Sequence, residues 1–355
     1  MLLSDLYQRL QASGAKACHQ AAVLRAWTRA LPLDFGPRPA QGFLPGPLRA
    51  ALPALQADLG RLASVRSHHP AADGSERLLV ELCDGQTVEC VLLPRRGVCV
   101  STQVGCAVGC VFCMTGRDGL RRHLHSAEIV AQVALARSRQ EVAKVVFMGM
   151  GEPAHNLDNV LDAIDLLGTD GGIGHKNLVF STVGDRRVFE RLHGGRVRPA
   201  LALSLHTTKP GLRAELLPRA PHIEPAELVA LAEAYARATH YPTQYQWTLL
   251  ADCNDGDDEI DNLVALLAGK YAVVNLIPYN TVPGAAFARP SQSRATAMAQ
   301  ALNRRGILTK LRQSAGQDVE AGCGQLRSRG AGPAPLVFQR GRRAGTDATG
   351  SPGDA

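Results

Sequence analysis

Three cysteines lie close together in the segment Cys106-Ala-Val-Gly-Cys110-Val-Phe-Cys113. Cysteine thiolates hold iron–sulfur clusters, and a set of three leaves one iron of a 4Fe–4S cluster free to bind a further ligand. The alternative is a zinc site, but zinc sites usually add a second Cys-x2-Cys pair or histidines. No second pair follows here, although His123 and His125 lie nearby. The spacing therefore predicts a 4Fe–4S cluster held by Cys106, Cys110 and Cys113.

An aromatic residue, Phe112, stands directly before the third cysteine. Together with the spacing of the triad, this resembles the cluster motif of radical S-adenosylmethionine (SAM) enzymes. The resemblance implies that the amino and carboxylate groups of SAM bind the free iron. It also implies that the chain generates an organic radical.

A glycine-rich turn ends a hydrophobic stretch at Phe147-Met-Gly-Met-Gly-Glu-Pro153. Glycines at the end of a strand allow the backbone to approach a ligand closely. Gly151 is therefore a candidate for contact with SAM, and Glu152 for accepting a hydrogen bond from its amino group. The alternative is a tight turn with a solvated glutamate.

Polar residues recur where further strands are expected to end, which is where the active sites of barrel enzymes collect. They are Ser181, Ser204 with its neighbours Leu205 and His206, and Asn280. Hydroxyl and amide groups there could hold the ribose or carboxylate of the cofactor. Each residue alone is more simply explained as a capping or structural group, but their recurrence favours cofactor binding.

Two further cysteines stand apart from the triad. Cys99 lies seven residues before it, and Cys323 lies far downstream in Glu-Ala-Gly-Cys-Gly-Gln-Leu. They are either ordinary thiols or reactive ones, since a thiolate is a nucleophile and can exchange disulfides. The other four cysteines are expected to be small buried apolar residues: Cys18, Cys83, Cys90 and Cys253.

The composition is that of a globular protein. Of the 355 residues 45% are hydrophobic and 20% are charged, and no apolar run approaches the roughly 18 residues of a membrane span. Without a signal-peptide pattern, the chain is expected in the cytoplasm, where nine cysteines would serve metal binding or catalysis and not a disulfide framework. A net charge of +7 suits a polyanionic partner such as nucleic acid without requiring one.

The first part of the chain, residues 1–95, is expected to be a small helical accessory domain that ends in a hairpin about Asp84-Gly85. From residue 96 to residue 327, strand-like and helical stretches alternate, which predicts an α/β domain with a parallel sheet. A cluster loop directly after the first strand favours the partial (β/α)6 barrel of radical SAM enzymes. Residues 328–355 are rich in Gly, Pro, Arg and Ala and are expected to be a disordered tail.

Within the α/β part, two sets of segments are expected. The strands are Val98–Val104, Lys144–Gly149, Asn177–Thr182, Pro199–Leu205, Gln244–Leu250, Ala272–Pro278 and Ile307–Arg312. The helices are Ser126–Gln140, Leu157–Leu167, Pro225–Ala238, Asp257–Gly269 and Gln292–Arg305. In the accessory domain, prolines including Pro53 are expected to separate loops and short helices.

With these features together, the chain resembles the RlmN/Cfr family of radical SAM 23S rRNA adenine methyltransferases over about residues 1–327. The resemblance rests on the triad and five further segments: Cys99-Val-Ser-Thr-Gln-Val-Gly-Cys106, Gly149-Met-Gly-Glu-Pro153, Leu203-Ser-Leu-His206, Asn275-Leu-Ile-Pro-Tyr-Asn280 and Cys323-Gly-Gln-Leu326.

This resemblance implies roles for the outlying residues. Cys323 would be methylated by one SAM molecule, and a 5′-deoxyadenosyl radical from a second would take hydrogen from that methyl group. The carbon radical would add to an adenine ring and join protein to RNA. Cys99 would then attack Cys323, form a disulfide and release the methylated base. Glu89 would accept the ring proton, with Cys99 a rival for that step.

The implied reaction is methylation of carbon 2 of an adenosine in 23S rRNA, with tRNA a second candidate substrate. Methylation of carbon 8, a divergent paralogue acting on another RNA, and a radical SAM enzyme with a non-RNA substrate are the alternatives. A zinc-dependent nucleic-acid-binding protein without catalysis is a further one. Departures from the family pattern at Trp247-Thr-Leu-Leu-Ala-Asp-Cys-Asn254 and Thr207-Thr-Lys-Pro leave the substrate open. A monomer and a reductant such as flavodoxin or ferredoxin are expected.

Overall fold

The computed structural model describes residues 1–33 and 43–329. Within the described residues, the chain begins with the helices α1 (Leu3–Ala12), α2 (Ala17–Thr28) and α4 (Gly46–Gly60). In α1, Leu3, Leu6 and Leu10 recur at helical spacing and are buried. Pro53 was expected to break a helix but lies inside α4, where its exposed ring faces solvent and only one backbone hydrogen bond is lost.

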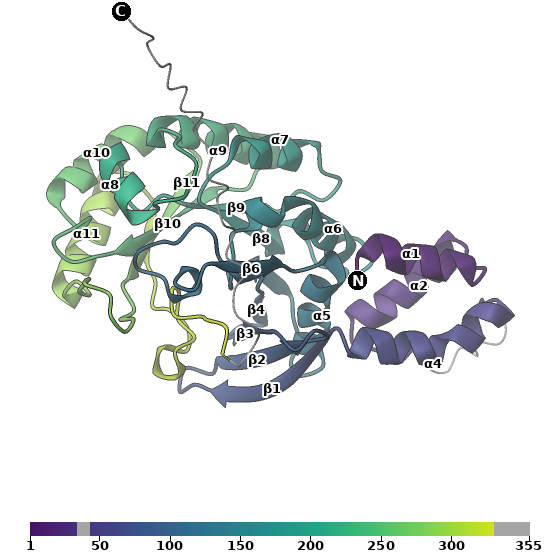
Figure 1. The fold of residues 1–355 in the computed structure, drawn as a ribbon. Helices are drawn as coiled ribbons and strands as arrows, with labels where there is room; N and C mark the ends of the chain where they lie inside the picture. Colours follow the sequence, from purple (N-terminus) through teal and green to yellow (C-terminus); the bar gives the residue numbers. More distant parts are fainter. Residues whose placement is uncertain (34–42, 330–355) are drawn as a thin grey trace, which may run out of the picture.

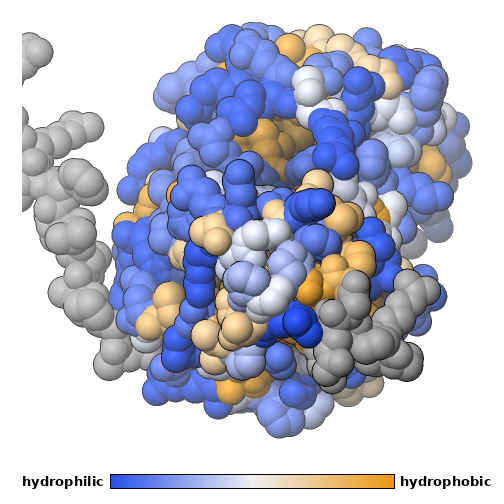
Figure 2. Space-filling view, turned by 90° about the vertical axis from the view of Figure 1, so that its right-hand side faces the viewer, coloured by the Kyte–Doolittle hydropathy of each residue, from blue (hydrophilic) through white to orange (hydrophobic). Residues whose placement is uncertain are grey.

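These accessory helices lie at one end of the molecule (Figure 1), and most of their buried residues are apolar. The face that carries them is mostly hydrophilic, with separate hydrophobic patches (Figure 2). Large apolar side chains exposed in this part of the chain include Leu2, Tyr7, Leu31 and Phe43. The expected burial of the non-cluster cysteines is confirmed for Cys90 but wrong for Cys18 and Cys83, which are exposed; Cys253 is half-buried.

An antiparallel meander connects the helices to the main sheet. It comprises β1 (Ala63–Pro70), β2 (Glu76–Leu82) and β3 (Thr87–Leu93), and β3 pairs antiparallel with β4 (Gly97–Cys99). The predicted hairpin about Asp84-Gly85 is confirmed, and β1 is an additional strand that the sequence analysis missed. The meander therefore continues the sheet of the α/β part instead of forming a separate layer.

The main sheet has ten strands in the order β1-β2-β3-β4-β7-β8-β9-β10-β11-β12. From β4 onward all neighbours are parallel. These strands are β7 (Lys144–Phe147), β8 (Leu178–Thr182), β9 (Ala200–Ser204), β10 (Thr243–Leu249), β11 (Ala272–Pro278) and β12 (Thr309–Leu311). Because β4 and β12 are not paired, the barrel is open.

Helices connect successive parallel strands. They are α5 (Ser126–Arg137), α6 (Leu157–Gly168), α7 (Arg186–Gly194), α9 (Pro225–Thr239), α10 (Asp257–Leu267) and α11 (Gln292–Arg304), with the short α8 (Pro210–Leu216) before α9. Figure 1 shows them around the outside of the curved sheet. The six strand–helix units confirm the predicted partial (β/α)6 radical SAM fold; α7 and α8 were not predicted.

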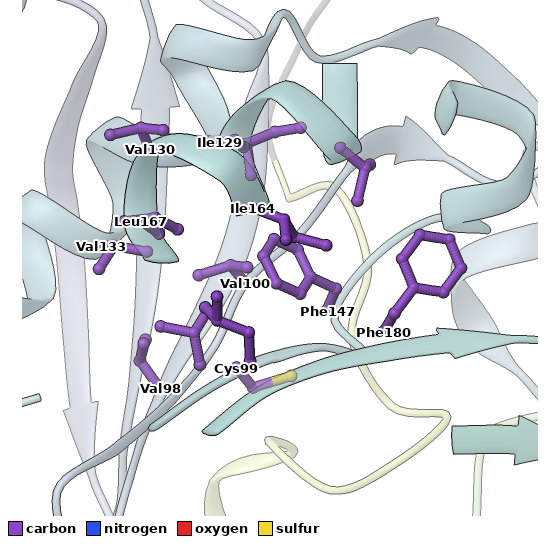
Figure 3. Close-up of a cluster of buried hydrophobic side chains, with 14 of the residues drawn as sticks. Val98, Cys99, Val100, Ile129, Val130, Val133, Phe147, Ile164, Leu167 and Phe180 are labelled. Carbon is purple, nitrogen blue, oxygen red and sulfur yellow. The ribbon is translucent and has the colours of Figure 1, made fainter. Parts of the chain in front are cut away.

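The core lies between the sheet and these helices. Phe147 on β7 and Phe180 on β8 are register partners and are buried with Ile129 of α5 and Ile164 of α6 (Figure 3). Side chains on the helix-facing side of the strands are thus mostly apolar. Polar groups collect beyond the carboxyl ends of the strands, where the candidate site lies.

The first predicted barrel strand, Val98–Val104, is interrupted. The chain leaves the sheet after β4, and β5 (Gln103–Gly105) pairs with β6 (Leu120–His123) in a separate two-stranded sheet. Ser101 lies at the break, where its hydroxyl donates to the Glu89 carbonyl and accepts from the Met150 N–H. The β5–β6 pair closes the base of the loop that carries the three cysteines.

Candidate active site

A cavity at the carboxyl ends of the parallel strands brings together nine of the thirteen predicted site residues. They are Cys106, Cys110, Cys113, Gly151, Glu152, Ser181, Ser204, His206 and Cys323. The cavity is where a barrel enzyme is expected to bind its substrate. Glu89, Cys99, Leu205 and Asn280 do not line it.

The three thiols of the cluster loop are close neighbours. Burial raises the pKa of Cys106 to about 12, although backbone N–H groups of Val108 and Gly109 oppose that shift. Burial, and then the neighbouring Cys113 and Cys106, raise the pKa of Cys110. Cys106 and Cys110 are therefore protonated without iron, and binding of iron must release their protons because the ligand is the thiolate.

Among the described residues, no group of three or more His, Cys, Asp or Glu side chains is arranged to hold one metal ion. A structural zinc ion needs four ligands at about 2.0 to 2.3 Å from one point. Three thiols that line one cavity can instead each bind a different iron of a cluster. The donor set therefore fits a 4Fe–4S cluster.

Glu152 follows β7 with its carboxylate beside the cavity. Its two oxygens accept hydrogen bonds from the Ala154 N–H and the Val183 N–H, both at 3.1 Å. Burial nevertheless raises the pKa of Glu152 to about 7. Gly151 is held at φ +103, and a Cβ there would lie 2.6 Å from the Gln103 Cβ, so glycine is required for the backbone to pass.

His206 follows β9 in the left-handed region, at φ +65. Its Nδ1 accepts a hydrogen bond of 3.0 Å from the Thr248 N–H, and its ring packs edge-on against Phe112 with centroids 5.0 Å apart. Burial, then the positive charge of Arg213, lowers its pKa to about 3. The ring is therefore neutral, with its second nitrogen available as a donor.

Other side chains of the cavity were missed in the sequence analysis. Gln246 and Thr248 of β10 line it, as do Met148 and Ile277. Gln246 and Thr248 stand two residues apart and therefore share one face of their strand. Polar residues at every second position of β10, beside the predicted Ser204 on the neighbouring strand β9, are a signal that could have identified Gln246 and Thr248.

The segment around Cys323 (residues 314–329) contacts the cluster loop, which is the loop 106–119 between β5 and β6. The Met114 N–H donates to the Gly324 carbonyl at 2.7 Å, and the Thr115 hydroxyl donates to the Leu326 carbonyl at 2.6 Å. Cys323 is accessible because it faces the cavity, yet the surrounding protein still raises its pKa by burial. A thiol far along the chain thus lies in the same cavity as the triad.

Asn280 is tied to this segment. Its Nδ2 donates to the Cys323 carbonyl at 3.0 Å and to the Ser314 hydroxyl at 2.8 Å. Leu205 places its side chain in the core, and its N–H donates to the Gln246 carbonyl. In this structure, Asn280 therefore supports Cys323 and Leu205 supports the sheet, and cofactor contact by either stays a prediction.

Cys99 ends β4 and is buried at the edge of the core, with its sulfur directed away from Val98 (Figure 3). Burial, then the neighbouring Cys323 and Cys90, raises the pKa of Cys99 well above its usual range. Cys323 is therefore one of the groups that act electrostatically on Cys99. All nine cysteines are free in the structure, so a Cys99–Cys323 disulfide stays a prediction.

Glu89 lies on β3 and is fully buried. Its carboxylate pairs with Arg77 and Arg329 and accepts from the Arg327 N–H. It does not line the cavity. Its predicted role as a proton acceptor therefore rests on the family resemblance alone.

This fold and this set of thiols define a radical SAM enzyme. A family model of the radical SAM superfamily matches residues 100–263. A probable RNA methyltransferase of Aromatoleum aromaticum is 73% identical over 329 residues, which cover 93% of each chain. One of Leptothrix cholodnii is 68% identical, over 94% of this chain and 96% of the relative.

The crystal structure of a radical SAM methyltransferase from Sphaerobacter thermophilus matches with a TM-score of 0.79 and 35% identity, over 92% of this chain and 98% of that one. The chain belongs to the radical SAM RNA methyltransferase family. This family uses a 4Fe–4S cluster and SAM, which agrees with the prediction from the cysteine triad. No helix in the described part of the chain is both long and apolar enough to cross a membrane.

Proposed function

We propose that this chain methylates carbon 2 of an adenosine in 23S rRNA, with tRNA as a second substrate, through a methyl group carried on Cys323. The observation that carries the proposal is the docking of the Cys323 segment on the cluster loop. Because of it, Cys323 and the three cluster thiols face one cavity.

A carried methyl group answers a chemical difficulty. Carbon 2 of adenine is electrophilic and has no lone pair with which to attack a methyl donor. The cofactors, when bound by Cys106, Cys110, Cys113 and the Glu152 turn, supply a methyl group and an organic radical. Cys323 holds the methyl group in the cavity, where the carbon can be joined to the base.

Cys99 completes the reaction by releasing the methylated adenine from Cys323. As a thiolate, its sulfur attacks the Cys323 sulfur; a sulfur–sulfur bond forms and the sulfur–carbon bond breaks. The electron pair of the broken bond stays with the carbon, which takes up a proton and becomes the methyl group of the product. The contribution of Cys323 to the raised pKa of Cys99 supports this pairing.

The ring proton has two candidate acceptors, Cys99 and Glu89. The Glu89 carboxylate already accepts hydrogen bonds from Arg77, Arg329 and the Arg327 N–H. The pKa of Cys99 is raised in part by Cys323, to which the adenine would be joined. We therefore favour Cys99 as the acceptor, and the proton that it takes passes to the released carbon when its sulfur attacks Cys323.

RNA as the substrate is supported by the names of the relatives from Aromatoleum aromaticum and Leptothrix cholodnii and by the net charge of +7, which suits a polyanion. A looped or single-stranded adenine can be turned into a pocket of this kind. We place the enzyme in the cytoplasm as a monomer, with flavodoxin or ferredoxin as its reductant.

The proposal is tested on the product. Ribosomal RNA and tRNA from cells with and without this protein are digested to nucleosides and analysed by mass spectrometry. We expect 2-methyladenosine that disappears with the protein and with Cys323→Ser. If 8-methyladenosine appears instead, the methylated position is carbon 8 and not carbon 2, and methyl transfer through Cys323 is still supported. If neither nucleoside depends on the protein, adenosine methylation is refuted.

A further inference from the structure

The Glu89 carboxylate has both oxygens occupied. Oε1 accepts from the Arg77 guanidinium and from Arg329 Nε, the latter at 2.8 Å, and Oε2 accepts from the Arg327 N–H at 2.8 Å. Arg77 is buried too. This buried carboxylate thus has charged donors on one oxygen and a backbone donor on the other, and such charge-assisted hydrogen bonds are the stronger ones.

Two of these three donors come from the chain just after Cys323. Arg327 and Arg329 follow Cys323 by four and six residues. The third donor, Arg77, also reaches the chain before Cys323, because its Nε donates to the Val319 carbonyl at 2.6 Å. The Glu89 cluster therefore fastens the Cys323 segment on both sides of the thiol.

Glu320 joins the two sides to each other. Its Oε2 accepts from the Arg327 guanidinium at 3.2 Å and from that of Arg329. The turn before β2 adds two contacts to the start of the segment, since Asp73 accepts from the Gly316 N–H and Asp318 accepts from the Ala72 N–H, both at 3.0 Å. Figure 1 shows the C-terminal segment beside the β1–β3 meander.

We infer that Glu89 is a positioning residue. Through Arg77, Arg327 and Arg329, it holds the Cys323 segment (residues 314–329) against the cluster loop, and it is not the general base that removes the ring proton. The inference rests on the proposed function for the role of Cys323. The clamp, meaning the contacts that join Glu89 to the Cys323 segment through these three arginines, is present in the structure independently of that role. A general base must reach the proton that it removes, whereas both Glu89 oxygens already accept hydrogen bonds and Glu89 does not line the cavity.

A positioning role and a general-base role of Glu89 lead to different expected results. In the proposed function, Cys323 is methylated before its carbon is joined to the adenine, and this first step needs no ring-proton acceptor. If Glu89 positions Cys323, then Glu89→Gln reduces this first step. If Glu89 is the base, then Glu89→Gln leaves the first step intact and methylated Cys323 persists.

The test uses cluster-loaded protein with Glu89→Gln, Arg329→Gln or Arg329→Lys. Glu81→Gln is the matched control, because Glu81 lies in the same meander and its partner Arg66 is 4.0 Å away at the surface. Two quantities are measured by mass spectrometry: amide hydrogen exchange of residues 314–329, and the methylated fraction of Cys323 per cluster after incubation with SAM.

We expect Glu89→Gln and Arg329→Gln to speed exchange in residues 314–329 by about tenfold, the loss of one charge-assisted hydrogen bond. Exchange elsewhere and cluster content should stay unchanged, and the methylated fraction should fall. Arg329→Lys, which keeps a cation for Glu89, should recover part of both effects. Glu81→Gln should resemble the unaltered protein.

Unchanged exchange in the Glu89→Gln and Arg329→Gln proteins would overturn the clamp. So would full methylation of Cys323 in Glu89→Gln together with loss of RNA product, which is the signature of a base. If unaltered protein never carries a methyl group on Cys323, the proposed function fails; the exchange measurement still decides whether the clamp exists.

Discussion

The backbone N–H of Met114, the residue after the third cluster cysteine, donates a 2.7 Å hydrogen bond to the carbonyl of Gly324, the residue after Cys323. This bond connects two loops that lie more than two hundred residues apart in the sequence. It holds Cys323, a thiol that is not part of the cluster triad, in the cavity that the triad lines. A cluster that only had to make a radical would not need this contact.

Gly324 is expected to be essential for that docking. It has φ +84, and a Cβ there would lie 3.1 Å from the Phe112 carbonyl oxygen. Gly324→Ala should therefore lower the methylated fraction of Cys323, measured by mass spectrometry, without loss of iron. Gly74→Ala is the matched control, because Gly74 has φ +82 and no atom within 4 Å of the added Cβ.

Both glycine variants carry a backbone cost of about 1 kcal/mol, since alanine disfavours the left-handed region. Only Gly324→Ala adds the contact with the cluster loop. Equal methylation of Cys323 in the two variants would show that the docking seen in the structure does not control the carrier.

The cluster prediction is tested by replacing single cysteines. Cys106→Ser, Cys110→Ser and Cys113→Ser should each yield anaerobically purified protein with most of its iron and sulfide missing, because one thiolate ligand is lost. Cys253→Ser, which removes a half-buried thiol near the cavity, should keep the full content. Zinc in place of iron in the unaltered protein would contradict the account.

His206 should make stability depend on pH. Its folded pKa of about 3 lies below the ordinary value of 6.5, so between these values the unfolded chain binds a proton that the folded chain does not. Stability is therefore fully present above about pH 6.5 and decreases as the pH falls, by about 1.4 kcal/mol per pH unit.

His206→Asn isolates this effect, because asparagine tolerates the left-handed region and its side-chain oxygen can still accept from the Thr248 N–H. Urea unfolding of the cluster-free proteins at pH 7 and pH 5 should show about 2 kcal/mol more loss in the unaltered protein than in the variant. Equal losses would mean that the His206 pKa is not lowered by folding.

Much of the fold and site could be predicted because their signals are local. The spacing of Cys106, Cys110 and Cys113 identifies a cluster without any tertiary information, and alternating strand and helix patterns located six of the seven parallel strands closely. The Val98–Val104 segment was predicted as one strand because its residues are apolar throughout. The break after Cys99 depends on Ser101, whose partners on β3 and beside β7 are distant in the sequence.

The arrangement around Glu89 could not be read from the sequence for the same reason. Arg327 and Arg329 lie in a segment whose composition resembles the tail that follows, and only the fold places them 2.8 Å from a carboxylate on β3. The short α7 did carry a signal, since Val188, Phe189 and Leu192 form one buried face, but its many charged residues obscured it. The predicted disordered tail, residues 328–355, is wrong at its start, because Ser328 and Arg329 are ordered by hydrogen bonds to Thr87 and Glu89 on β3. For residues 330–355, which lie outside the described residues, it stays a prediction.

The central claim is that Cys323 carries the methyl group to RNA and that Cys99 releases it. Cys99→Ala removes the attacking thiol, so the joined intermediate should accumulate. The most direct measurement is mass spectrometry of anaerobically purified, iron-replete Cys99→Ala after nuclease and protease digestion, with Cys90→Ala, a buried thiol on the adjacent strand, as the control. We expect a nucleotide covalently attached to Cys323 in Cys99→Ala and none in Cys90→Ala. An unmodified Cys323 thiol in both proteins would refute methyl transfer through Cys323.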